Sequence, residues 1–294
     1  MWFWLRLTSA KKIIIPIYYC EPTTLRSMFM EVDPKYIKND LLLVVPVYNE
    51  AAILYNKLNI LLEFLVRHNM NFKLVISVDY SGDKSIEIVE NFSKCHENVT
   101  YIVHNHKMGR GYAVREAWKL FDANYYSFID LDLATGLQVI LDSYYLLKLN
   151  KADLVTASRY VEGAIVKRPP LRNWISIAYN KLVELIFDDK ILDHQCGFKI
   201  ITQLTKEKML DQTSEDSWFW DTELLVLAKS QGLNVIELGV EWVETKYSKT
   251  SFIRLLDDVY LHGSGILRLL EKVHKIRSSS KDIKPQQTET MLKE

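Results

Sequence analysis

The sequence has few cysteines, no excess of charge of either sign and no long apolar run, and each absence excludes a class of protein. Its three cysteines, Cys20, Cys95 and Cys196, are odd in number and widely spaced. This spacing argues against a disulfide framework or a zinc knuckle and fits a reducing compartment. We therefore expect a cytoplasmic protein.

The charges of the chain balance. Lysine and arginine together number 37, and aspartate and glutamate together also number 37. A balanced chain has no global basic field of the kind that makes nucleic-acid binding probable, so we expect no nucleic-acid partner. Any anion must be bound by a local cluster of basic residues.

No stretch of about 18 uncharged apolar residues occurs, so the sequence predicts no transmembrane helix. The N-terminal extension, residues 1–39, begins with tryptophans, tyrosines and isoleucines interrupted by basic residues and by Pro16. Such a composition suits a membrane interface, and packing against the protein's own surface explains it equally well. We expect a peripheral protein on the cytoplasmic face of a membrane.

From Leu41 onward, strand-like apolar runs alternate with amphipathic stretches, which is typical of an α/β fold with parallel strands linked by helices. With 48% hydrophobic residues the chain can bury a full core, and we assign residues 40–250 to one domain. The predicted strands are Leu41–Val47, Phe72–Val78, Val99–Val103, Tyr125–Ile129 and Leu154–Ala157. The predicted helices are Ala51–Arg67, Lys84–Phe92, Arg110–Phe121 and Leu137–Leu149.

Two carboxylates follow the fourth predicted strand, in the sequence Asp130-Leu131-Asp132. In extended chain, side chains two residues apart point to the same side, so both acids can face one divalent cation such as Mg²⁺ or Mn²⁺. The alternative is a strand end with two solvated acids. We expect a weak metal site that needs the substrate to complete it.

Basic residues at two further places predict anion sites. Lys107, Arg110 and Arg115 surround a glycine-containing helix start, where backbone amides and positive charge could hold a diphosphate. Arg172 and Ser176 lie one turn apart at the start of a later predicted helix, and Arg159 could join them to bind a phosphate monoester. The alternatives are a solvated basic turn and surface arginines around a Pro-Pro turn.

Together, the motifs Val45–Glu50, Val78–Ser85, His106–Arg115 and Asp130–Asp132 resemble those of family 2 glycosyltransferases of the GT-A fold, a Rossmann-like and mostly parallel sheet flanked by helices. The resemblance covers residues 41–251, with Arg110 in place of the usual lysine and an irregular loop after Asp79. It implies a nucleotide-sugar pocket in which Asp130 also contacts the donor. The residues that it implies for the rest of this pocket are Pro46, Tyr48, Glu50 and Asp79.

Within this family, the arginine and serine set is similar to that of the polyprenyl phosphate sugar synthases. The string Asp193–Lys199 resembles the glucosyltransferase branch most, which implies that Asp193 contacts the sugar or acts as a base and that Gln195 lies near the acceptor. The string Trp218–Leu224 resembles an aromatic-Asp-x-Glu-Leu element, which implies that Asp221 and Glu223 lie on the acceptor side. The alternative for these two acids is a favourable interaction with a helix dipole.

The C-terminal region, residues 251–278, carries two apolar stripes separated by Gly263-Ser264-Gly265, which predicts amphipathic helices. Basic residues accompany the second stripe, so it suits a membrane surface, whereas we expect the first to pack against the domain. Residues 279–294 are polar and are predicted to be disordered.

These motifs lead to one hypothesis: a metal-dependent, inverting glycosyltransferase that moves a hexose from a nucleotide sugar to dolichyl or other polyprenyl phosphate. UDP-glucose is the favoured donor and GDP-mannose the alternative. The expected catalytic residues are Asp130, Asp132, Arg159, Arg172, Ser176 and Asp193. Two rivals remain: transfer to a sugar hydroxyl, with Asp193 or Asp221 as general base, and a silent protein that binds nucleotide sugar or lipid.

Overall fold

The computed structural model describes residues 13–21, 24–32, 39–243 and 252–282. The chain divides into two compact units, Met1–Asn39 and Asp40–Glu294. The first contains an antiparallel hairpin of β1 (Ile13–Glu21) and β2 (Thr24–Val32). Residues 1–12 and 283–294 lie outside the described part, so the predictions for the tail and for the tryptophans of the extension are not tested.

The second unit is built on a seven-stranded sheet with the order β10-β7-β9-β6-β3-β4-β5. Neighbouring strands are parallel except for β9, which runs antiparallel to both β6 and β7. The predicted α/β class with a mostly parallel sheet is therefore confirmed. The strands are β3 (Leu41–Val47), β4 (Phe72–Val78), β5 (Val99–Val103), β6 (Tyr125–Ile129), β7 (Leu154–Ser158), β9 (Phe198–Thr202) and β10 (Val235–Gly239).

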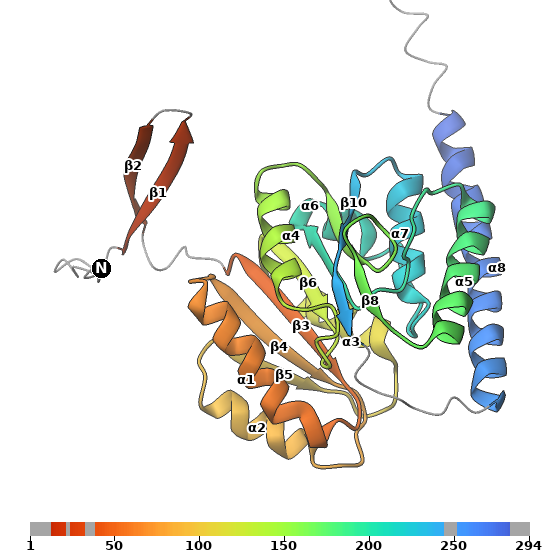
Figure 1. Ribbon diagram of the computed structural model, residues 1–294, viewed down its shortest axis with the longest axis horizontal. Coiled ribbons are helices and arrows are strands. Elements are labelled where there is room, and N and C mark those ends of the chain that lie inside the picture. Colours follow the sequence, from red (N-terminus) through yellow and green to blue (C-terminus); the bar gives the residue numbers. More distant parts are fainter. Residues whose placement is uncertain (1–12, 22–23, 33–38, 244–251, 283–294) are drawn as a thin grey trace, which may run out of the picture. The chain divides into compact units, whose positions relative to one another are not determined.

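Helices cover both faces of this sheet (Figure 1). Side chains of a strand alternate between the faces, so in β3 Leu41 and Leu43 enter one core whereas Leu42 and Val44 enter the other. The first core is covered by α1, α2 and α4, and the second by α3, α5, α6, α7 and α8. The helices of the first layer are α1 (Ala51–Arg67), α2 (Ser85–Lys94) and α4 (Gln138–Lys148).

The remaining helices are α3 (Arg110–Leu120), α5 (Pro170–Phe187), α6 (Gln203–Met209), α7 (Trp220–Ser230) and α8 (Phe252–Asp282). β8 (Ile165–Lys167) pairs in parallel with β11 (Glu241–Val243), and in the chain β8 comes just before α5. Pro170 occupies the first turn of α5, where its missing N–H has no carbonyl to bind. In the part of the chain that is described, no helix combines the length and the apolar character needed to cross a membrane.

The prediction of separate C-terminal helices was wrong. α8 is one continuous helix, and Gly265 lies inside it, where a Cβ would stand 2.5 Å from the ring of Phe219. This glycine allows close helix approach rather than a break. The second apolar stripe also packs on the domain, since Ile266, Leu269 and Val273 are buried. The residues of the first stripe have no described side-chain environment.

Candidate active site

A cavity of about 580 Å³ opens where β3, β4 and β6 end, at the carboxyl edge of the parallel strands. Ligands of open α/β sheets bind at this edge because the loops that follow the strands meet there. The cavity brings together eight residues that the motifs predicted. These are Pro46, Tyr48, Glu50, Asp79, Lys107, Arg110, Asp130 and Asp132.

Asp130 follows directly after the buried end of β6, and its carboxylate keeps 23% of its surface exposed. Both of its oxygens accept hydrogen bonds from Arg110 Nη1, at 3.0 and 3.1 Å. Gly197 lies against this carboxylate: a Cβ there would be 2.2 Å from Asp130 Oδ2. The glycine of the Asp193–Lys199 string therefore makes room for the acid that faces the cavity.

Asp132 is half-buried on the cavity wall. Its Oδ1 accepts the backbone N–H of Ala134 at 3.1 Å, and its carbonyl accepts Lys57 Nζ at 2.6 Å. Leu133 between them has a positive φ of 55°, an uncommon conformation for a branched residue. The loop is thus held in a shape that its local sequence alone does not favour.

The donor set at the cavity could supply two carboxylates to a divalent cation. Asp130 and Asp132 supply hard oxygen ligands, as Mg²⁺ and Mn²⁺ prefer. Within residues 39–243 and the other described ranges, no group of three or more histidine, cysteine, aspartate or glutamate side chains is arranged to hold a metal. A cation here would need further oxygens from a ligand.

Arg110 connects the cavity to a buried charge cluster. Its guanidinium forms ion pairs with Asp130 and Asp221 and lies 4.1 Å from the ring centre of Trp218. Lys199 also pairs with Asp221, at 2.9 Å, and both of these side chains are fully buried. Burial lowers the pKa of Lys199 to about 7. Asp221 therefore lies beneath the cavity, where it binds two cations of the protein.

The glycine-containing loop before α3 is fixed by Asp79. The Asp79 carboxylate accepts the backbone N–H groups of Met108 and Gly109, at 2.9 and 2.8 Å, and of Tyr80 at 3.0 Å. Lys107 in this loop places its ammonium 4.5 Å from the ring centre of Tyr48. The resemblance implies that Asp79 contacts the nucleotide. In the structure its carboxylate oxygens accept backbone N–H groups and fix the loop that borders the cavity.

Arg115 and Trp218 are placed differently from expectation. Arg115 is not among the lining residues; it donates to the carbonyl of Thr213 at 2.6 Å and pairs with Asp216. Trp218 lines the cavity, although the sequence reasoning assigned roles only to the acids that follow it. Its contact with Arg110 joins segments about a hundred residues apart, so no local signal in the sequence marks it.

Arg159 and Asp193 form a buried bidentate ion pair. Arg159 Nε and Nη2 donate to the two oxygens of Asp193 at 2.7 and 2.8 Å, and the Arg159 backbone N–H donates to the same carboxylate at 2.9 Å. The guanidinium lowers the pKa of Asp193 despite its complete burial. An acid that is ionised, inaccessible and fully paired is disfavoured as a general base. The assignment of Asp193 as a sugar contact or a base stays a prediction.

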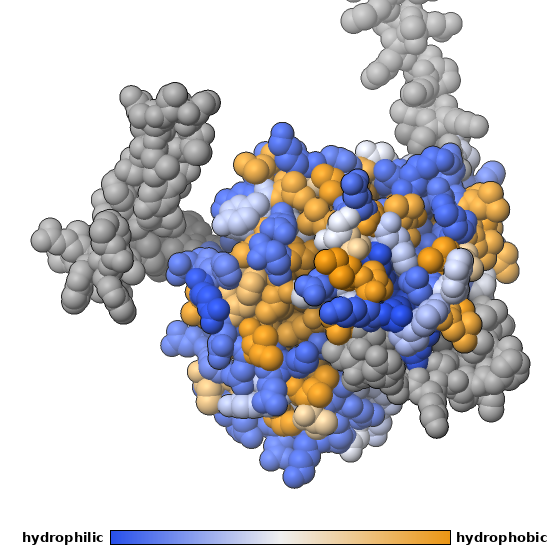
Figure 2. Space-filling model, viewed as in Figure 1, coloured by the Kyte–Doolittle hydropathy of each residue, from blue (hydrophilic) through white to orange (hydrophobic). Residues whose placement is uncertain are grey.

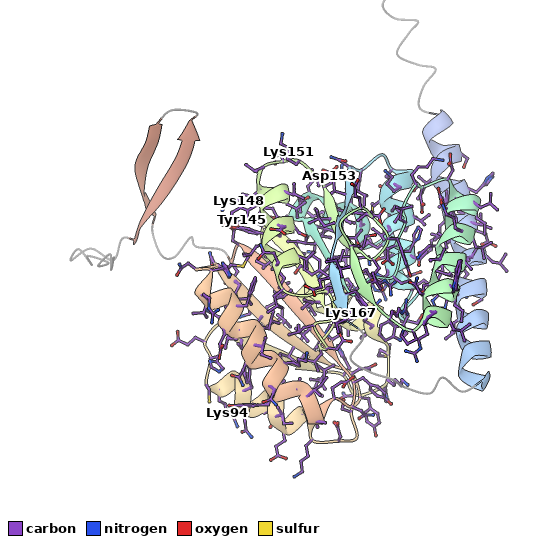
Figure 3. The ribbon with its side chains drawn as sticks, viewed as in Figure 1. Lys94, Tyr145, Lys148, Lys151, Asp153 and Lys167 are labelled. Atoms are coloured by element: carbon purple, nitrogen blue, oxygen red, sulfur yellow. The ribbon has the colours of Figure 1, made fainter. Side chains whose placement is uncertain are left out.

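Ser176 and Arg172 lie in the first two turns of α5, and both are half-buried. Ser176 Oγ accepts a hydrogen bond from Arg168 Nη1 at 2.9 Å, which brings a third residue, Arg168, into this basic cluster. Lys167, which Figure 3 labels, directly precedes Arg168 at the end of β8. The resulting site has several donors for an anion.

Gln195 and Glu223 contact α8. The Gln195 amide contacts Nε2 of His262, and Glu223, which is 1% exposed, pairs with Lys272. Glu223 also accepts the backbone N–H groups of Ser214 and Glu215, both at 2.9 Å. Glu223 lies in the first turn of α7, as predicted, and its carboxylate is occupied by contacts within the protein. Its place on the acceptor side stays a prediction.

Comparison with known proteins agrees with this architecture. Residues 42–207 match the family described as glycosyl transferase family 2. The chain is 30% identical to glycosyltransferase AglD of Haloferax volcanii over 76% of the chain and 36% of that protein. It is also 30% identical to the dolichyl-phosphate beta-glucosyltransferase ALG5A of Trichomonas vaginalis, over 79% of the chain and 76% of that protein.

A crystal structure with a similar fold is glucosyl-3-phosphoglycerate synthase from Mycobacterium tuberculosis in complex with phosphoglyceric acid. Its TM-score is 0.60 at 14% identity, and the alignment covers 80% of each chain. Together with the sheet order and the cavity at its carboxyl edge, these matches confirm the expected GT-A fold. The chain is a member of glycosyl transferase family 2.

Proposed function

We propose that the chain transfers a hexose from a nucleotide sugar to dolichyl or other polyprenyl phosphate, with inversion at the anomeric carbon. The observation that carries this proposal is the basic cluster of Arg168, Arg172 and Ser176 at the start of α5, a helix with an exposed apolar stripe. UDP-glucose is the favoured donor, because relatives at 26–30% identity are named dolichyl-phosphate beta-glucosyltransferases.

The apolar stripe of α5 supports a lipid acceptor. Leu171, Trp174 and Leu185 are 72%, 70% and 82% exposed, and Ile175 and Leu182 lie between them on the same face. Figure 2 shows orange hydrophobic atoms over the position of α5 at the right-hand edge of the view. Exposed aromatic and aliphatic residues beside arginines suit a membrane surface, where the arginines could meet a lipid phosphate. We propose this membrane surface as a partner.

In the proposed reaction, an oxygen of the acceptor phosphate attacks the anomeric carbon as the bond to the nucleoside diphosphate breaks. This oxygen is already ionised at neutral pH, so the protein needs to position it and no strong base is required. Arg172, Ser176 and Arg168 would orient the phosphate. Lys107 and Tyr48 would contact the donor, and a cation held by Asp130 and Asp132 would neutralise charge on the leaving group.

The buried state of Asp193 and Asp221 favours a phosphate acceptor over a sugar hydroxyl. A hydroxyl must lose its proton, and the two acids named for this task are fully buried and paired with Arg159 and with Arg110 and Lys199. Neither can take a proton from a ligand in the cavity without first losing its partners.

The test is a panel of nucleotide sugars incubated with a short polyprenyl phosphate and Mn²⁺ or Mg²⁺, with lipid-linked sugar as the readout. We expect turnover with UDP-glucose, a loss of roughly 10²-fold or more in Asp132→Asn, and an equally severe loss in Arg172→Ala. Asp122→Asn, a change at an exposed acid, serves as the control.

Binding of nucleotide sugar without turnover by the wild type would instead identify the silent binding protein. Transfer to a free sugar hydroxyl that survives Arg172→Ala would identify the hydroxyl acceptor. Turnover that is unchanged by a chelator would contradict the metal dependence.

A further inference from the structure

The loop at residues 212–219 joins α6 to α7 and contributes one residue to the lining of the cavity. It leads into α7 and carries Trp218, which lines the cavity and stacks on Arg110 at 4.1 Å. Because Trp218 is 57% exposed, its position depends on the backbone of this loop more than on packing around its own ring. What holds the loop therefore determines the shape of the cavity.

On one side the loop contacts the start of α3. The N–H of Tyr112 donates to the carbonyl of Asp216 at 3.1 Å. A Cβ on Gly109 would stand 2.5 Å from that carbonyl oxygen, and one on Gly111 would stand 2.7 Å from the carbonyl oxygen of Glu215. These two glycines allow the loop to approach the helix that also carries Arg110.

On the other side the loop contacts α8. Arg268 donates from Nε and Nη2 to the two oxygens of Glu215, at 2.7 and 2.9 Å. Lys272 Nζ donates to Ser214 Oγ at 2.6 Å and to the carbonyl of Gln212 at 3.3 Å, and it also pairs with the buried Glu223. The absence of a side chain at Gly265 also lets α8 pack against Phe219, at the end of the same loop.

We propose that α8 is a positioning element of the donor pocket, in which Arg268 and Lys272 fix the 212–219 loop and thereby set the affinity for a nucleoside diphosphate. Arg268 makes two hydrogen bonds to Glu215, and Lys272 pairs with the buried Glu223. Such contacts fix the geometry of the loop more strongly than unpaired charges on the surface would. Only the identity of the ligand rests on the proposed function; the holding of the loop does not.

The contact can be tested by charge reversal and rescue. The variants are Arg268→Glu, Glu215→Arg and the double exchange, and the control is Glu271→Arg, an exposed change on the same helix. Two quantities are measured: hydrogen exchange of residues 212–219 in the free protein, and the dissociation constant of UDP in the presence of Mn²⁺ by calorimetry.

We expect each single reversal to speed exchange of the loop and to raise the dissociation constant about fivefold, because like charges replace a bidentate pair. The double exchange should restore both values, and Glu271→Arg should change neither. In turnover assays, KM for the donor should rise while kcat stays within about twofold, since the reacting groups are untouched.

Unchanged loop exchange in Arg268→Glu, or a double exchange that restores nothing, would overturn the proposal. A wild-type protein that binds no UDP or GDP would contradict the proposed function, and the exchange data on the free protein would still decide whether α8 holds the loop. Faster exchange with unaltered affinity for UDP would contradict the role of α8 in the pocket.

Discussion

At the residue scale, exposure separates the acids that face the cavity from those that lie buried behind it. Asp130 and Asp132 are partly exposed on the cavity wall, whereas Asp193 and Asp221 are fully buried with cationic partners. Removing the cation from a buried carboxylate lowers the free energy of unfolding, so we expect such acids to contribute to stability. The four residues look equivalent as motif members and differ only through their surroundings.

For this reason, we expect Asp193→Asn to destabilise the protein by about 3–5 kcal/mol, because it leaves the buried Arg159 without a countercharge. Chemical denaturation measures this loss as a fall in the free energy of unfolding. Asp188→Asn, at a side chain that is 77% exposed, is the control and should change stability by less than about 0.5 kcal/mol. A fully stable Asp193→Asn protein that lacks transfer activity would return Asp193 to a catalytic role.

At the scale of the elements, α5 has an unusual arrangement of side chains. Its inner face contributes Val183 and Phe187 to the core, while the opposite face exposes a stripe from Leu171 to Leu185. A soluble helix normally directs one apolar stripe inward and a polar face outward. Two apolar faces on one helix indicate two partners, the domain itself and a second apolar surface.

We therefore expect the double change Trp174→Ser and Leu185→Ser to weaken binding to phosphatidylcholine vesicles that contain phosphatidylserine. Removal of two large apolar groups from a lipid contact should cost roughly tenfold or more in the partition coefficient, measured by vesicle sedimentation. Leu120→Ser changes a leucine at the end of α3 that is 61% exposed, and it is the control. Equal vesicle binding by all three proteins, with a dimer that the double change dissociates, would assign the stripe to self-association.

Residue patterns predicted α1 and the first four strands of the sheet to the residue, because apolar runs of strand length and the apolar period of a helix are local signals. They did not predict β9, since its place between β6 and β7 depends on contacts far apart in the chain. The same holds for the site. The residues lining the cavity follow strand ends, whereas the partners of Arg115, Asp193 and Glu223 come from distant segments.

At the scale of the whole molecule, the sheet has a core on each face, and the reactivity of two cysteines can show when one core opens. Cys196 is buried in one core, and burial raises its thiol pKa to about 12, whereas Cys95 is exposed just after α2. The thiolate is the reactive form, so burial and the raised pKa both protect Cys196 from reaction at pH 8.

Iodoacetamide at pH 8 should therefore modify Cys95 rapidly in the native protein and spare Cys196 until the sheet unfolds. Peptide mass spectrometry across a urea series measures both rates, and protection of Cys196 should be lost together with the circular dichroism of the sheet. Early modification of Cys196 at low urea would show that this half of the sheet opens on its own.

The reversed direction of β9 also has a consequence for the order in which the chain folds. During synthesis, β3, β4, β5 and β6 are complete by residue 129 and can pair with one another, but β6 keeps an open edge until Phe198–Thr202 emerges. β7 has no strand partner before that point either, because its neighbours are β9 and β10. We expect the nascent chain to expose this unpaired edge over some seventy residues of elongation, the stage at which chaperone binding or aggregation would act.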